Sequence, residues 1–183
     1  MTNGGNKKMT RNEKLRHDRL TFYKDDIEQI DKLLAEFLRL SGAKCALLID
    51  KEGHLVTKRG EQRTIDIDTI SALVAGSFAA TKEMARLLGE EEFTAMYHQG
   101  ERDNIQLSLV GDRTILTVIF DESTTLGMVR LYVGEAVRKL EDLFAEIARQ
   151  RRDGAGAGAE EIEEMQKFGN SAKDSLDALF DRS

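Results

Sequence analysis

The sequence lacks proline and tryptophan and contains a single cysteine, Cys45, among its 183 residues. One cysteine excludes an intramolecular disulfide, so we expect the chain to work in a reducing compartment, the cytoplasm. No apolar run approaches the roughly 18 residues that a membrane-spanning helix needs. The basic start of the sequence is not followed by the apolar stretch of a secretory signal. We therefore expect a cytoplasmic protein that does not insert stably into a membrane.

The sequence also has no excess of positive charge, because the net charge is −6 at neutral pH. This balance disfavours sequence-independent binding to nucleic acid, and no nucleic-acid partner is expected. The basic residues cluster in residues 1–22, which we interpret as a flexible extension, with a docking arm for an acidic surface or lipid headgroups as the alternative. The 40% hydrophobic and 33% charged content predicts one sizeable core under a well-solvated surface.

Motifs for catalysis or cofactor binding are missing as well. The stretch "GSFAATK" lacks the spacing of a phosphate-binding loop, and no dinucleotide fingerprint follows the first predicted strand. His17, His54 and His98 fall in different segments, and none has a second His or Cys at metal-ligand spacing. Cys45 lies in an apolar run, which is typical of an inert buried thiol. We therefore expect no catalytic residues, no metal and no cofactor, and a protein that is not an enzyme.

The pattern that is present predicts helices alternating with hairpins. Apolar residues at helical spacing predict long helices that begin near residues 23, 66 and 124. Short apolar or alternating runs between them predict strands within "CALLID", "HLVTKRG", "EFTAMYHQ" and "NIQLSLVGDRTILTVIF". Because hairpins dominate, we expect a mainly antiparallel sheet with helices on both faces, an α/β (α+β) fold.

Composition divides the chain into four parts: the basic extension 1–22, a folded domain 23–150, a Gly/Ala linker 151–159 and an acidic amphipathic tail 160–183. The tail is too short to fold alone, so we expect it to dock onto another surface.

One side of the predicted long middle helix carries mainly small side chains. The stretch "SALVAGSFAATKEMA" places small side chains together, namely Ser71, Ala72, Ala75, Gly76, Ala79 and Ala80. Such a flank permits close approach of a partner, although alanines are also good helix formers on any surface.

Two segments carry a family resemblance. "DIDTISALVAGSFAATKEMARLLGEEEF" and "SLVGDRTILTVIFDESTTLGMVRL" resemble the Roadblock domain family, and within it the bacterial MglB group that regulates the Ras-like polarity GTPase MglA. The resemblance covers about residues 24–149 and includes the hairpin "ALLIDKEGHLV". It implies a five-stranded antiparallel sheet with the middle helix on one face and the outer helices on the other. It also implies a homodimer whose sheets join through the third strand.

The resemblance further implies that the paired middle helices bind one GTPase of the MglA type and accelerate its GTP hydrolysis by repositioning the GTPase's own catalytic groups. The implied role is control of cell polarity or motility, with localisation at a cell pole. If Ile67, Ile70, Val74 and Met84 face the sheet, the residues expected to bind the GTPase are Ser71, Ala72, Ala75, Ala79, Lys82, Glu83 and Arg86. The residues expected at the dimer interface are Gly76, Ala80, Phe93, Thr94 and Met96, and Leu176, Leu179 and Phe180 are expected to dock the tail.

Alternatives remain at this point. Arg86 invites the interpretation of an arginine finger, which the resemblance argues against. A scaffold would bind a GTPase or a response regulator without stimulating hydrolysis. A small-molecule sensor is a third reading, disfavoured because the predicted core faces carry few polar side chains.

Overall fold

The computed structural model describes residues 22–61 and 66–152. These residues fall into two units, which are treated separately, with the boundary after Leu140. In the first unit the elements follow in the order α2 (Lys24–Ser41), β1 (Cys45–Asp50), β2 (Leu55–Gly60), α3 (Ile67–Leu87), β3 (Ala95–Gln99), β4 (Asn104–Val110) and β5 (Thr114–Phe120). Residues 126–140 are helical and complete this unit, and residues 141–152 of the second unit are also helical.

The strands form a five-stranded sheet in the order β2-β1-β5-β4-β3, as expected. Each neighbouring pair is antiparallel, and β2 and β3 are the two edge strands. The central strand β5 is buried along its whole length. Thr117 of β5 pairs with Leu47 on one side and Leu107 on the other, so these three side chains share one face of the sheet.

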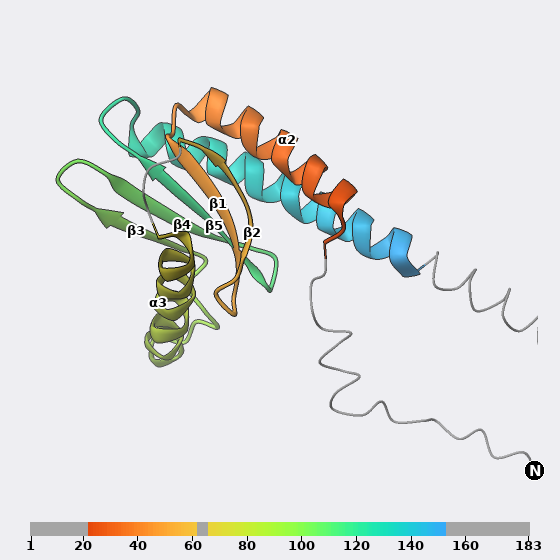
Figure 1. The fold of residues 1–183 in the computed structure, drawn as a ribbon. Coiled ribbons are helices and arrows are strands. Elements are labelled where there is room, and N and C mark those ends of the chain that lie inside the picture. Colours follow the sequence, from red (N-terminus) through yellow and green to blue (C-terminus); the bar gives the residue numbers. More distant parts are fainter. Residues whose placement is uncertain (1–21, 62–65, 153–183) are drawn as a thin grey trace, which may run out of the picture. The chain divides into compact units, whose positions relative to one another are not determined.

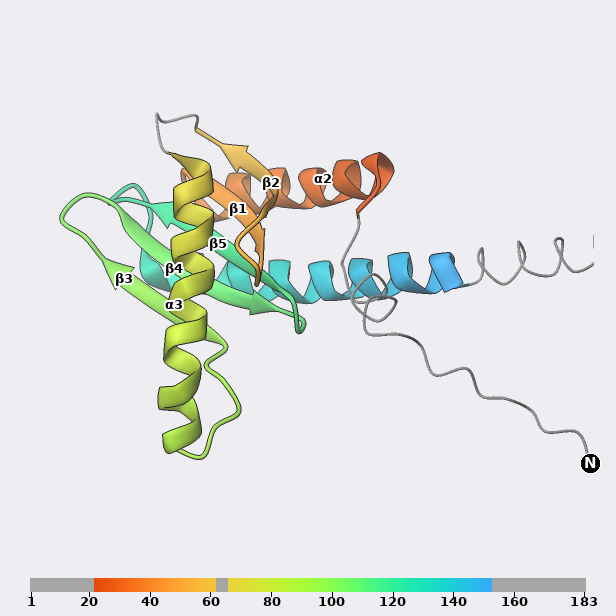
Figure 2. The same cartoon turned by 60° about the horizontal axis from the view of Figure 1, so that its bottom comes forward.

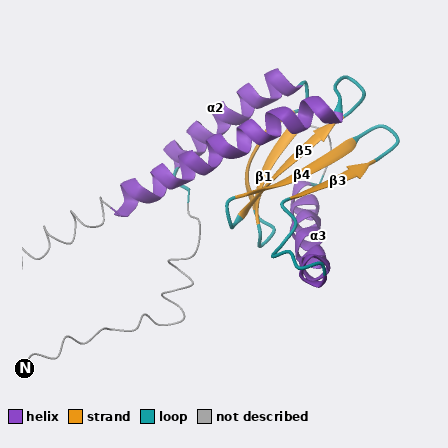
Figure 3. Cartoon of the chain, turned by 180° about the vertical axis from the view of Figure 1, so that it is seen from behind, coloured by secondary structure: helices purple, strands orange, loops and turns teal. Residues whose placement is uncertain are grey.

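Helices cover the two faces unequally. Helix α3 lies alone across one face, whereas α2 and the helix over residues 126–140 lie side by side on the other (Figures 1, 2 and 3). Under α3 the core contains Leu47, Leu107 and Ile115 of the sheet together with Val74 and Phe78 of the helix. On the opposite face α2 buries Ile30, Leu34 and Phe37. The arrangement is the expected one, with the middle helix apart from the two outer helices.

Local signals explain where the helices begin and end. Gly42 ends α2, with φ of 69° and a backbone N–H that donates to the Leu38 carbonyl at 3.0 Å. At the start of α3, Asp66 is the N-terminal cap and accepts the Thr69 backbone N–H at 3.1 Å. The Thr69 hydroxyl also donates to Asp66, and these bonds lower the pKa of the Asp66 carboxyl.

Among the described residues, no helix is both long and apolar enough to cross a membrane.

Candidate protein-binding surface on helix α3

The inner side of α3 differs from the side expected from the sequence. Its buried residues are Ser71, Val74, Ala75, Phe78 and Ala85. Ser71 and Ala75 were expected to point outward, and that expectation is wrong, because they are 0% and 7% exposed. Part of the small flank therefore serves close packing of α3 within the chain rather than contact with a partner.

The turn between β1 and β2 lies against this part of α3. Gly53 in this turn has φ of 94°, and a Cβ added to it would lie 3.1 Å from the Cα of Ala72. A larger residue at position 53 would therefore crowd the backbone of α3 at this point.

Met84 was expected to face the sheet, and that expectation is also wrong. Its side chain is 52% exposed, and Leu73 and Leu87 are 64% and 78% exposed. Together with the exposed Ala80 they follow helical spacing along one side of α3. We call Leu73, Ala80, Met84 and Leu87 the apolar flank. A helix with apolar residues over so wide a sector can be packed in more than one rotation, and hydrophobicity alone does not choose between them.

A second exposed strip carries small and charged side chains. It contains Ala72, Ala79, Lys82, Glu83 and Arg86, which were all expected to point outward and are exposed. We call these five residues the polar flank. Within it the Arg86 guanidinium binds the Glu83 carboxylate through two hydrogen bonds, of 3.1 Å and 2.5 Å.

The two flanks lie toward different edges of the sheet. The Thr81 hydroxyl is 3.5 Å from the sulfur of Met96 in β3, so the side of α3 that carries Thr81 and Met84 is the β3 side. Ala72 of the polar flank instead lies against the β1–β2 turn. The apolar flank is therefore next to the edge strand β3, while the polar flank faces away from it.

Space is open beside the apolar flank. Gly76 and Ala80, both expected at a dimer interface, are exposed, and a Cβ added to Gly76 would meet nothing within 4 Å. Among the described residues, strand β3 pairs only with β4, which leaves its outer edge available. Phe93 and Thr94, also expected at the dimer interface, precede β3, which begins at Ala95.

Comparison with known proteins assigns the chain to a family. The model of the Roadblock/LC7 domain matches residues 29–120. The chain belongs to the Roadblock/LC7 family. The resemblance drawn from the sequence is thereby confirmed, and with it the fold class.

Within that family, the chain is similar to solved structures of MglB proteins. The gliding protein MglB of Thermus thermophilus is 36% identical, with a TM-score of 0.66 over 69% of this chain and 96% of that one. MglB of Myxococcus xanthus is 35% identical, with a TM-score of 0.65 over 69% of this chain and 96% of that one. An uncharacterised protein of Methanocaldococcus jannaschii is 25% identical over 115 residues, which are 63% of this chain and 99% of that relative.

Some residues fall outside this surface. Leu176, Leu179 and Phe180, expected to dock the tail, lie outside the described residues.

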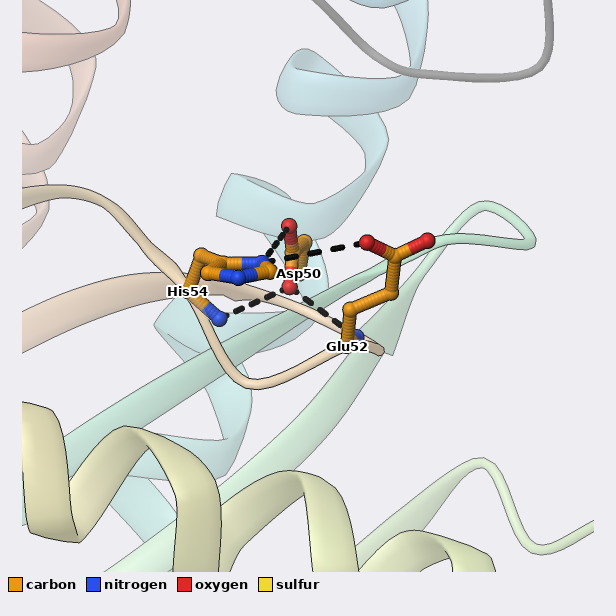
Figure 4. Close-up of side chains that lie close together, drawn as sticks. All are labelled: Asp50, Glu52 and His54. Atoms are coloured by element: carbon orange, nitrogen blue, oxygen red, sulfur yellow. Dashed lines mark hydrogen bonds and ion pairs between the residues drawn. The ribbon is translucent and has the colours of Figure 1, made fainter. Parts of the chain in front are cut away.

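The structure also brings together Asp50, Glu52 and His54 at the β1–β2 turn (Figure 4). This cluster was missed in the sequence because only His and Cys were considered as partners of each histidine. The alternation of these residues within a tight turn is the signal that would have found them.

Proposed function

We propose that the chain is a homodimeric regulator of a Ras-like GTPase of the MglA type, and that the GTPase binds on the α3 helices. The observation that carries this proposal is the exposed apolar flank beside the free edge of β3. An apolar strip of this kind is a common mark of a protein-binding surface.

The dimer is proposed from the position of this strip. A twofold axis beside β3 would pair the two β3 edges and bring the two apolar flanks together in one operation. Leu73, Met84 and Leu87 would then lose their exposure to water, and full burial of each such side chain contributes about 1.5–3 kcal/mol. The exposed Gly76 and Ala80 would allow the helices to approach closely.

The polar flank is the proposed contact with the GTPase. Ala72 and Ala79 offer a low surface, and Lys82 and Glu83 offer charges that can select one partner over another. The proposed contact leaves out Ser71 and Ala75, because they are buried.

The proposed mechanism uses the catalytic groups of the GTPase itself. Arg86 is the only arginine of the polar flank, and it is held by Glu83 on the same helix. An arginine finger must leave its own protein and reach the transferred phosphate. The position and pairing of Arg86 therefore favour repositioning of the GTPase's groups, as the family resemblance implies, and the similarity to a gliding protein supports a role in motility or polarity.

Single-turnover GTP hydrolysis by the MglA-type GTPase of the same organism tests this proposal. We expect the chain to accelerate hydrolysis at least about tenfold, which is 1.4 kcal/mol off the barrier. Binding without acceleration would instead assign the chain a scaffold role. Absence of binding to both the GTP and GDP forms would contradict the proposal.

The tail has a proposed role that rests on the resemblance. A chain ending at residue 153 should bind the GTPase more weakly or alter nucleotide exchange, while light scattering still reports the dimer. Unchanged binding and unchanged nucleotide rates would contradict this role.

A further inference from the structure

Three side chains with metal-binding atoms converge at the β1–β2 turn (Figure 4). Asp50 ends β1, and Glu52 and His54 follow in the turn. The Nδ1 atom of His54 lies 3.0 Å from Oδ2 of Asp50 and 3.9 Å from Oε2 of Glu52. One ligand atom from each residue falls within 4.8 Å of the others.

The turn fixes the orientation of Asp50. Its Oδ1 accepts the backbone N–H of Glu52 at 2.9 Å and that of His54 at 2.8 Å. The backbone N–H of Asp50 also donates to the His54 carbonyl at 2.9 Å. One carboxylate oxygen is thereby held by the backbone, and the other is presented to the imidazole.

These distances are close to those between ligands of one ion. Zinc bonds of 2.0–2.2 Å in a tetrahedron place neighbouring ligand atoms about 3.3 Å apart. The pair of His54 and Asp50 is within a few tenths of an ångström of that spacing. Glu52 must approach by about 0.6 Å to reach it, and its side chain is 68% exposed and free to swing.

We propose that Asp50, Glu52 and His54 bind a divalent first-row transition ion of the Zn²⁺ class, with water in the remaining position. One imidazole nitrogen with two carboxylates suits Zn²⁺, Ni²⁺ or Co²⁺, whereas Ca²⁺ and Mg²⁺ prefer oxygen ligands throughout. Two carboxylates beside one imidazole also supply the negative charge that attracts such an ion.

The nearest lysine of the turn does not fill the site. The Lys51 ammonium donates to both carboxylate oxygens of Glu92, at 2.8 Å and 3.1 Å. Lys51 therefore neutralises Glu92 on the loop after α3 rather than the carboxylates of Asp50 and Glu52.

This site is separate from the proposed GTPase regulation and does not depend on it. The turn that carries the three ligands nevertheless packs against Ala72 of the polar flank through Gly53. A bound ion would cross-link both ends of that turn and stiffen the support of α3 at this point.

Isothermal titration of the full chain with ZnCl₂ in a non-chelating buffer tests the site. We expect a micromolar site that is lost or weakened at least about tenfold in His54→Gln and in Glu52→Gln. His17→Gln is the matched control and should leave the affinity unchanged. Mg²⁺ or Ca²⁺ at the same concentration should not compete with Zn²⁺.

Circular dichroism establishes that each variant is folded before it is titrated, and the exposed Glu52 side chain makes Glu52→Gln the safer of the two. Zn²⁺ affinity that is unchanged in both His54→Gln and Glu52→Gln would overturn the proposal. So would the absence of Zn²⁺ binding by the folded wild-type chain up to millimolar concentration.

Discussion

Helices α2 and α3 cover opposite faces of the same sheet, yet they present different surfaces to the solvent. Both bury apolar residues against the strands, including Phe37 of α2 and Phe78 of α3. The exposed positions of α2 carry mainly charged and polar side chains, among them Lys24, Asp25, Glu28, Lys32, Glu36 and Arg39. Those of α3 include Leu73, Met84 and Leu87. Helix α2 thus exposes mainly polar side chains, whereas α3 has a second apolar side that no described part of the chain covers.

The polar contacts of α2 and α3 differ as well. Asp31 of α2 accepts the Thr57 hydroxyl at 2.6 Å and binds the Arg59 guanidinium, which ties the helix to β2. Under α3, by contrast, the buried hydroxyls of Ser71 and Thr117 find no hydrogen-bond partner in the described part of the chain. Substitutions on the outer side of α3, or where α3 packs against the sheet, should therefore have effects that differ from those of matched substitutions in α2.

The largest expected effect is on the free energy of unfolding, when the buried phenylalanine of either helix is removed. This effect should be similar in the two helices. Phe78→Ala and Phe37→Ala remove side chains that are 6% and 3% exposed, and each should lower the free energy of unfolding by about 3–5 kcal/mol. Urea denaturation at a fixed chain concentration measures both. A cost below about 1 kcal/mol for Phe78→Ala alone would show that α3 is not part of the core.

The next effect should separate the helices. Met84→Asp places a charge on the apolar flank and should weaken dimerisation at least about tenfold, because one buried apolar side chain per copy is lost. Sedimentation equilibrium measures the dissociation constant. Ala35→Asp, at an exposed position of α2, is the control and should leave it unchanged. Equal constants for both variants would remove the distinction between the helices.

These two predictions also show what the sequence could and could not provide. The order of elements, the caps at Gly42 and Asp66 and the antiparallel sheet follow from turn residues and local periodicity. The rotation of α3 does not, because Met84 and Leu73 are as apolar as Val74 and Phe78. The rotation depends on contacts between distant segments, such as the close approach of Gly53 to the backbone of Ala72, which local periodicity does not reveal.

The candidate metal site was missed for a related reason. Asp50, Glu52 and His54 alternate along the chain, and in an extended strand alternate side chains would be spread over several ångströms. Only the tight turn folds the three ligand atoms into one cluster.

A smaller effect concerns the fit of α3 to the sheet. Ser71→Ala removes a fully buried hydroxyl that has no hydrogen-bond partner among the described residues, so it should stabilise the chain by about 1 kcal/mol. Thermal unfolding measures the change. A loss of stability would mean that the hydroxyl is satisfied, for example by a buried water molecule.

The smallest expected effect lies away from both helices. Hydrogen bonds from Lys44 and Ser123 hold the pKa of Asp121 well below the usual range. The stabilisation is present above the ordinary aspartate pKa of about 4 and is lost as the pH falls toward the folded-state value. Melting temperatures measured from pH 7 to pH 2 should therefore decline less steeply below pH 4 in Asp121→Asn. Parallel curves for variant and wild type would contradict this linkage.

The most direct test of the difference between α2 and α3 is the affinity of the GTP-loaded, MglA-type GTPase for two matched variants. Ala79→Arg and Ala35→Arg add the same side chain to an exposed alanine, one on the polar flank of α3 and the other on α2. We predict that Ala79→Arg weakens binding at least about tenfold, or 1.4 kcal/mol, while the dimer persists and Ala35→Arg binds like the wild type. Binding that is unaffected by Ala79→Arg, or is lost in Ala35→Arg, would contradict the assignment of α3 as the GTPase-binding surface.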